Sequence, residues 1–215
     1  MFAISQTSRG LFCFEWSSTE SGPKIVNLSH LKTIKSFNNS DIINSIVNNF
    51  NFTIKNQSNS LSITIDSDNV LISCLNVDSK NISKSISWYE NEILDSDFFD
   101  NYYNYYYPLI SSDECLVISL PKLYKDNIIN SSLDNNLNLI YLSLDIFSAA
   151  TLVKQLYIKN SKEDYIIWKI CNNNNNTFIV YNEDNIKSYV KLKKRKNNFV
   201  IDFHAGCKEY SNKIL

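Results

Sequence analysis

Glycine is scarce in this sequence. The 215 residues include three glycines, at positions 10, 22 and 206. Loops that cradle phosphates need glycine, because a side chain keeps the backbone N–H groups away from the phosphate oxygens. Three widely separated glycines therefore argue against a glycine-rich nucleotide-binding loop.

Paired cysteines and clustered histidines are also missing. No two of the five cysteines lie at CxxC spacing, and the two histidines stand far apart in the chain. Most of the cysteines fall in apolar, strand-like runs, which is typical of reduced, buried thiols in a cytosolic protein. We therefore expect neither a disulfide framework nor a metal site. The cysteines are Cys13, Cys74, Cys115, Cys171 and Cys207.

A basic excess is missing as well, since the formal net charge is −1 and the pI is about 6.1. Nucleic-acid-binding proteins usually carry such an excess, so we expect no nucleic-acid partner. The one basic cluster is KLKKRK at 191–196. A cluster of this kind can contact acidic lipid headgroups or nucleic acid, but it is more often the solvated tip of a hairpin.

Long apolar runs are missing too. No stretch of about 18 apolar residues is present, which excludes a transmembrane helix in this sequence. The first residues, MFAISQTSRG, lack the apolar core of a signal peptide. The expected location is therefore the cytoplasm, with no direct membrane insertion.

Alternating apolar and polar residues are abundant, and they predict a mixed α/β chain organised around residues 61–157. Short strands are expected over 61–65, 70–77, 116–120 and 139–144, with a meander of three strands before them and another meander after residue 165. The run YYNYYY at 102–107 is expected to be an edge strand; a platform for stacking bases is the alternative, but no basic residue lies near it.

Helical periodicity is strongest over 81–94 and 146–157. Asp78 or Ser79 is the expected N-cap of the first helix, and Asp145 that of the second. Trp88 lies off the apolar stripe of the first helix. It either covers a neighbouring surface or contacts a ligand. A further helix is expected over 40–50, and Pro121 marks the start of another.

The order of these elements resembles the actin-like pilus-assembly protein family PilM and its relatives, the cell-division protein FtsA and the cytoplasmic part of the secretion protein GspL. The resemblance rests on SLSITIDSDNVLISCLNVDSKNISKSISWYENEIL and on CLVISLPKLYKDNIINSSLDNNLNLIYLSLDIFSAATLV. In such proteins a helix with a Trp-Glu-like signature follows a hairpin, and a strand ending in Pro-Lys starts the next helix.

The resemblance implies an α/β, ribonuclease-H-like domain over 1–160, interrupted by an inserted α/β subdomain at about 67–138. Residues 161–215 then correspond to the first strands of a second such domain, so we expect a β-meander from a second domain that is truncated or reduced.

The resemblance also implies lost nucleotide chemistry. Relatives carry an acid and a glycine in the turn after the first strand, where Ser5 and Thr7 stand here; Lys169 and Cys171 occupy the matching turn of the second domain. No catalytic residue, cofactor or metal is therefore expected.

The function implied is a non-catalytic cytoplasmic scaffold of a type IV pilus or type II secretion-like machine. It would receive the cytoplasmic tail of a PilN-like inner-membrane protein, lie at the inner membrane through that partner, and tolerate self-association. The groove expected for the tail is walled by residues 70–77 and 82–94, with Ile72, Leu75, Trp88 and Tyr89 as candidate contacts. Two alternatives stay open: an actin-like ATPase with degenerate phosphate loops, and an accessory protein that contacts membrane or nucleic acid through 191–196.

Overall fold

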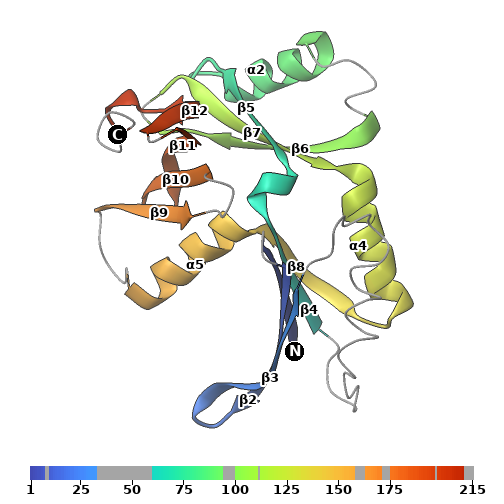
Figure 1. The fold of residues 1–215 in the computed structure, drawn as a ribbon. Helices are drawn as coiled ribbons and strands as arrows, with labels where there is room; N and C mark the ends of the chain where they lie inside the picture. The colour runs from blue at the N-terminus through green and yellow to red at the C-terminus, as the bar shows by residue number, and fades with distance from the viewer. Residues whose placement is uncertain are drawn as a thin grey trace. The chain divides into compact units, whose positions relative to one another are not determined.

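A computed structural model shows the arrangement of the chain as two compact units, which we describe separately (Figure 1). The first unit comprises Met1–Asn69 and Pro121–Ser148, and the second comprises Val70–Leu120 and Ala149–Leu215. The helix expected over 40–50 and the position of Cys171 lie outside the described residues. The structure describes residues 1–7, 10–32, 60–93, 100–110, 112–157, 163–170, 175–196 and 198–210.

The first unit is built on a sheet of five strands in the order β3-β2-β1-β4-β8. The first three strands form an antiparallel meander, while β4 and β8 continue the sheet parallel to β1. Ile4 on β1 lies between Cys13 of β2 and Ile63 of β4, and all three side chains are buried. The strands are β1 (Phe2–Thr7), β2 (Gly10–Thr19), β3 (Gly22–Lys32), β4 (Ser60–Ile65) and β8 (Asn138–Leu144).

Helix α4 (Lys122–Asp134) precedes β8, and α5 (Asp145–Tyr157) follows it. Pro121 stands just before α4, where its missing N–H costs no helical hydrogen bond. Tyr124 and Ile128, one turn apart, bury the same face of α4. The helix ends at Asn135, and Asn136 then takes a left-handed conformation with φ of 54°. Both helices confirm the sequence prediction.

The inserted segment forms a sheet in the order β5-β7-β6, with one helix packed on it. Ile82, Ile86 and Tyr89 contact a buried cluster that includes Leu75 and Val117, so the predicted apolar stripe faces the sheet. The run YYNYYY is the edge strand, as expected. The elements are a short 3₁₀ turn (η1, Ser67–Asn69) before the insert, then β5 (Leu71–Asn76), α2 (Ile82–Trp88), a π-helical turn (η2, Tyr89–Ile93), β6 (Tyr102–Pro108) and β7 (Glu114–Pro121).

The N-cap of α2 differs from the prediction. Asn81 caps the helix, accepting a hydrogen bond from the Lys84 backbone N–H at 3.3 Å, in place of Asp78 or Ser79. Asp78 instead accepts from the N–H of Lys80 at 2.9 Å. The carboxylate therefore closes the preceding turn, which delays the helix by about one turn of chain.

The last four strands form an antiparallel meander in the order β12-β11-β10-β9. Its interior is filled by fully buried side chains of the two central strands, among them Ile179, Val180 and Tyr189. The basic run at 191–196 occupies the end of the β11–β12 hairpin, where Arg195 pairs with Asn198, so the expected hairpin tip is confirmed. The strands are β9 (Asp164–Ile170), β10 (Asn175–Asn182), β11 (Asn185–Arg195) and β12 (Asn198–Gly206).

The α/β class with mixed sheets is thus confirmed. The compact units follow other boundaries than the predicted domains, because α4 belongs with the first sheet while the insert clusters with the last four strands. The domain assignment, including a truncated second domain, stays a prediction. Among the described residues no helix has the length and hydropathy needed to cross a membrane.

The expectation of buried thiols holds for two of the described cysteines. Cys13 and Cys115 are buried, Cys74 and Cys207 are half-buried, and all four are free. Burial raises the pKa of Cys13 to about 12, and burial together with the nearby Glu114 carboxylate does the same for Cys74. Neither thiol forms a thiolate near neutral pH, so neither is a nucleophile or a ready metal ligand.

Candidate functional site

Polar side chains gather at the carboxyl ends of the parallel strands of the first unit. Gln6 precedes the last residue of β1, Asp66 follows β4 directly, and Asp145 follows β8. Parallel strands place their carboxyl ends at one edge of the sheet, and such edges are the usual ligand sites of open α/β sheets. Gln6 and Asp66 are both buried, so this edge is the first place to look for chemistry.

The two carboxylates at this edge hold the backbone. Asp145 Oδ1 accepts from the N–H of Ser67 at 3.1 Å and from the N–H of Ile146 at 2.8 Å, so it links the end of β4 to the start of α5. Asp66 Oδ1 accepts from the N–H of Asp68 at 3.0 Å and closes the η1 turn. Both acids therefore act as caps at the sheet edge.

A buried tyrosine completes the edge. The Tyr124 hydroxyl of α4 donates to Gln6 Oε1 at 2.7 Å, and both residues are buried. Burial raises the pKa of Tyr124 well above its usual range, and the Asp66 carboxylate raises it further, although the hydrogen bond to Gln6 acts in the opposite direction. Tyr124 therefore stays protonated as a structural donor. No group of three or more His, Cys, Asp or Glu in the described part of the chain can hold a metal ion.

Sequence reasoning missed this cluster. It predicted Asp145 as a helix cap and a strand over 61–65, and it did not bring Asp66, which follows that strand, together with Asp145 and Tyr124. The signal is present in the sequence, because two apolar strands end in the same way, as SLSITID and LIYLSLD. Pairing these two strand ends required the parallel register of β4 with β8.

Ser5 and Thr7 both lie within β1, whereas the resemblance placed them in the turn after the first strand, and both are half-buried. Ser5 pairs with Phe12 of β2 and Thr64 of β4. The Thr7 hydroxyl donates to the carbonyl oxygen of Gly10 at 3.2 Å, which ties the end of β1 to the start of β2. A Cβ on Gly10 would lie 2.1 Å from the carbonyl oxygen of Leu31, so this glycine permits close strand packing. Gly10 therefore allows β2 and β3 to pack closely in the sheet.

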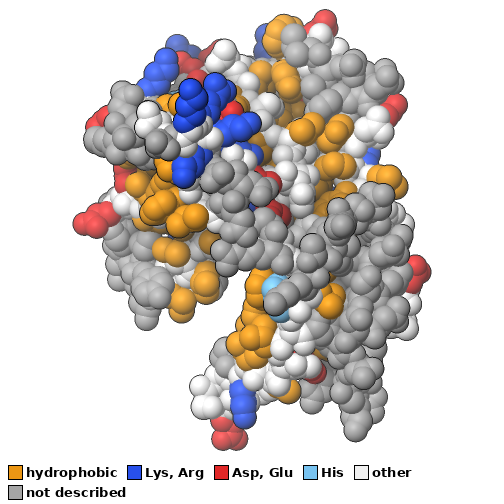
Figure 2. Space-filling model, in the orientation of Figure 1, with side chains coloured by type: hydrophobic (Ala, Val, Ile, Leu, Met, Phe, Trp, Pro, Cys, Tyr) orange, Lys and Arg blue, Asp and Glu red, His pale blue; other side chains and the backbone are white. Residues whose placement is uncertain are grey.

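Lys169 lies on β9, half-buried and opposite Thr177 of β10. Its neighbours Ile166, Trp168 and Ile170 point to the other face of the strand and are exposed. Trp168 stacks on Phe178 at 5.4 Å between ring centroids and donates to Asn176 Oδ1 at 3.2 Å. Exposed apolar side chains are visible over this part of the second unit in Figure 2.

The four candidate contacts on the insert divide into buried and exposed side chains. Leu75 belongs to the core cluster of the insert, and Tyr89 packs against that cluster. Ile72 is half-buried and points to the opposite face of β5 from Leu75. Trp88 is 55% exposed at the end of α2. The structure therefore brings Leu75 and Tyr89 together as core residues and leaves Trp88 as the side chain with the most surface to offer a partner.

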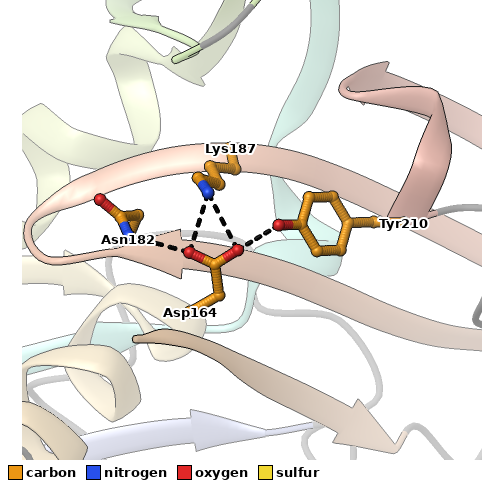
Figure 3. A network of polar contacts seen from close by, with 4 residues as sticks. All are labelled: Asp164, Asn182, Lys187 and Tyr210. Atoms are coloured by element: carbon orange, nitrogen blue, oxygen red, sulfur yellow. Dashed lines mark hydrogen bonds and ion pairs between the residues drawn. The ribbon is translucent and has the colours of Figure 1, made fainter. Parts of the chain in front are cut away.

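A second polar cluster, which the sequence did not indicate, lies on the last meander (Figure 3). The Asp164 carboxylate at the start of β9 accepts from Asn182 Nδ2 and from Lys187 Nζ, each at 2.9 Å, and from the Tyr210 hydroxyl. The hydrogen bonds from Tyr210 and Lys187 lower the pKa of Asp164 to about 2. Its members come from four separate stretches of chain, so no local sequence motif predicts this cluster. The cluster ties the last described turn to the sheet.

Comparisons with known proteins show which folds this chain resembles. No model of a protein family matches the chain, and no curated protein matches it in sequence. Among solved structures, a PilM–PilN type IV pilus biogenesis complex matches with a TM-score of 0.60 and 9% identity, over 99% of this chain and 64% of that chain. The cytoplasmic domain of EpsL, an inner-membrane component of the type II secretion system of Vibrio cholerae, matches with a TM-score of 0.52 and 7% identity, over 93% of this chain and 79% of that one.

A Bacteroides thetaiotaomicron protein described as having an actin-like ATPase fold and unknown function matches with a TM-score of 0.45 and 10% identity, over 99% of this chain and 73% of that chain. The chain spans 64% of the length of the PilM–PilN structure's chain that it matches. Along nearly its whole length, at low sequence identity, this chain is similar in structure to the actin-like folds of PilM and cytoplasmic EpsL.

Proposed function

We propose that this protein is a non-catalytic scaffold of a type IV pilus or type II secretion-like machine, and that it binds the cytoplasmic tail of a PilN-like inner-membrane protein. It would act in the cytoplasm, at the inner membrane, through that partner. The observation that carries the proposal is the exposed Trp88 on the inserted subdomain of a chain whose fold is similar to PilM and EpsL.

The chemistry of the first unit supports a role without catalysis. Asp66 and Asp145 are committed to backbone N–H groups, and the glycine nearest the first turn serves strand packing. An ATPase needs carboxylates that hold Mg²⁺ and a group that orients the attacking water. Ser5 and Thr7 supply neither a carboxylate nor a glycine-lined phosphate cradle.

The insert supports a binding role. Helix α2 and the turn after it pack against the core of the insert through Ile82, Ile86 and Tyr89. The outer surface of the helix is therefore already formed before a ligand binds. Trp88 stands on that rigid base with more than half of its surface free. Tryptophan is the residue type most enriched at interface hot spots, because one side chain buries a large apolar area together with a hydrogen-bond donor.

The test uses a fluorescein-labelled synthetic peptide with the sequence of the cytoplasmic tail of a PilN-like protein encoded in the same genome. Fluorescence anisotropy with the full chain should give saturable binding. Trp88→Ala should weaken binding about 30-fold, since a hot-spot truncation costs on the order of 2 kcal/mol. Trp16→Ala is the matched control, because Trp16 is also exposed, at 37%, but lies on β2 of the first unit.

Both variants should keep the wild-type thermal midpoint, because both side chains are exposed. Equal binding by wild type and Trp88→Ala would remove the α2 surface from the proposal. No binding of the tail peptide by the wild-type chain would contradict the scaffold function itself.

A further inference from the structure

The end of the β11–β12 hairpin concentrates positive charge in a way that the tail-binding proposal does not use. Lys193, Lys194, Arg195 and Lys196 follow one another there, and all four side chains are exposed. Figure 2 shows Lys and Arg side chains gathered over this part of the second unit. The chain as a whole has a formal net charge of −1, so the sequence outside these four residues carries −5 (−1 minus 4).

These four cations, which we call the basic tip, are not neutralised by the protein. Throughout the described ranges of the chain, no carboxylate forms an ion pair with any of them. Asp202 is the single acid on the two strands, and it lies at the β-bulge beside Lys191 and Leu192, away from the turn. Four solvated cations with no ion-pair partner among the described residues offer their charge to an external anion.

Apolar side chains are interleaved with this charge. Lys194 pairs directly with Phe199 across the hairpin, and Leu192 pairs with Ile201 two positions further from the turn. Cross-strand partners point to the same face of a sheet, so Phe199 and Ile201 lie on the face that carries Lys194. Phe199 is 43% exposed and Ile201 is 38% exposed. Charge and apolar surface are thus presented together.

The tip is also rigidly held. Eight residue pairs connect β11 with β12, and Lys196 takes the left-handed conformation, with φ of 54°, that a tight hairpin turn requires. At the base of the hairpin, Tyr189 and Phe203 pack edge to face. On its other side β11 pairs with β10 as far as Lys193. The cations are therefore carried at the end of a sheet in which β11 is held between two strands.

We propose that the basic tip docks on an anionic lipid bilayer. Lysine and arginine are attracted to the negative surface potential, while exposed Phe and Ile favour the boundary between headgroups and acyl chains. A nucleic acid fits the pattern less well, because its phosphates would be bound by the cations alone and would leave the exposed Ile201 without an apolar partner. The contact is peripheral, and it is separate from capture of a partner's tail.

The experiment is sedimentation of the full chain with vesicles of phosphatidylcholine alone and of phosphatidylcholine with phosphatidylglycerol. Binding should appear with the anionic vesicles and disappear as salt is raised, because salt screens the surface potential. Each cation near a bilayer contributes roughly a fivefold change in partitioning, so Lys193→Gln/Lys194→Gln should reduce binding about 30-fold. Phe199→Ser should weaken binding and leave its salt dependence in place.

The matched control is Lys24→Gln/Lys80→Gln, which removes the same charge from two exposed positions outside the hairpin. This variant should bind the anionic vesicles as the wild type does. The proposal is overturned by absence of binding to anionic vesicles, by equal binding to neutral ones, or by an equal loss in the control. Tighter binding to a short DNA duplex than to the anionic vesicles would also overturn it and assign the basic tip to nucleic acid.

Discussion

The two antiparallel meanders of this chain begin with strands that differ in sequence pattern and in position within the sheet. β1 and β9 each start a series of hairpins, but β1 (FAISQT) buries Phe2 and Ile4 on one face, whereas β9 (DYIIWKI) has large apolar residues on both faces. β1 pairs with β2 on one side and with β4 on the other, whereas β9 is the last strand of its sheet. Ile4 of β1 is 3% exposed and Ile166 of β9 is 51% exposed.

The difference shows that β9 carries large apolar side chains on its exposed face as well as on its buried face, where Ile167 is 8% exposed. An open edge with large apolar side chains invites pairing with another chain unless something blunts it. On β9 the exposed face is partly covered by a side chain of the neighbouring strand, because the Trp168 ring stacks on Phe178 of β10. The two strands thus offer matched positions at which the comparison can be tested.

The largest effect is expected from a matched pair of isoleucine truncations. Ile4→Ala should lower the free energy of unfolding by about 2–5 kcal/mol, because it leaves a cavity in the core of the first sheet. Ile166→Ala on the β9 edge should cost at most about 1 kcal/mol, mostly through lower strand propensity. Urea unfolding followed by circular dichroism measures both. Similar losses would mean that the β9 face is as well packed as the β1 face.

A second comparison of the two meanders uses the glycine that each has at a strand end. A Cβ would lie 2.1 Å from the Leu31 carbonyl oxygen at Gly10, and 2.2 Å from the Lys187 carbonyl oxygen at Gly206. Each of Gly10→Ala and Gly206→Ala should destabilise the protein by on the order of 2–4 kcal/mol, from backbone displacement and positive φ together. Gly22 also has positive φ, at 114°, but no atom lies within 4 Å of its Cβ position.

Gly22→Ala is therefore the control that isolates the strain of positive φ, and it should cost about 1–2 kcal/mol. The same urea titrations measure all three variants. If Gly22→Ala proved as damaging as the other two, the close approach of the backbones would not be the cause.

The smallest effect concerns Asp164, for which the first sheet has no counterpart in its described residues. The folded-state pKa of Asp164 lies at about 2, below the ordinary value of 3.8. The folded state therefore binds this proton less readily than the unfolded chain does. The resulting stability is fully present above about pH 4 and is lost as pH falls towards 2.

Asp164→Asn should lower the thermal midpoint slightly at neutral pH, and the gap from the wild type should close between pH 4 and pH 2. The effect is small because an exposed ion pair is screened by water. Thermal scans across this pH range provide the measurement. A constant gap down to pH 2 would show that the Asp164 charge contributes no stability.

Local periodicity carried much of the fold. The helices over 81–94 and 146–157 and the edge strand YYNYYY were all predicted, because each depends on neighbours within a few residues. The predicted N-cap of α2 was wrong, since Asp78 and Asn81 compete for nearby N–H groups and local sequence does not rank them.

The sites were less accessible to prediction. The position of Trp88 off the apolar stripe follows from helix geometry, but its exposure was left open between covering a neighbouring surface and contacting a ligand. The burial of Leu75 depends on which face of β5 the helix covers, and that is a tertiary choice. The cluster of Asp66, Asp145 and Tyr124 needed strand order, and the contacts of Asp164 join segments up to 46 residues apart. Sequence periodicity predicts neither the order of strands in a sheet nor contacts between distant segments.

The most direct test of the account is calorimetry of the full wild-type chain with Mg-ATP, followed by an assay for released phosphate. A scaffold whose edge carboxylates are bound to backbone N–H groups, and whose described residues hold no cluster of metal ligands, should give no measurable binding heat and no phosphate. A Ser5→Asp/Thr7→Gly variant, run beside it, shows whether restoring an acid and a glycine brings binding back. Micromolar binding or phosphate release by the wild-type chain would contradict the account and establish an actin-like ATPase.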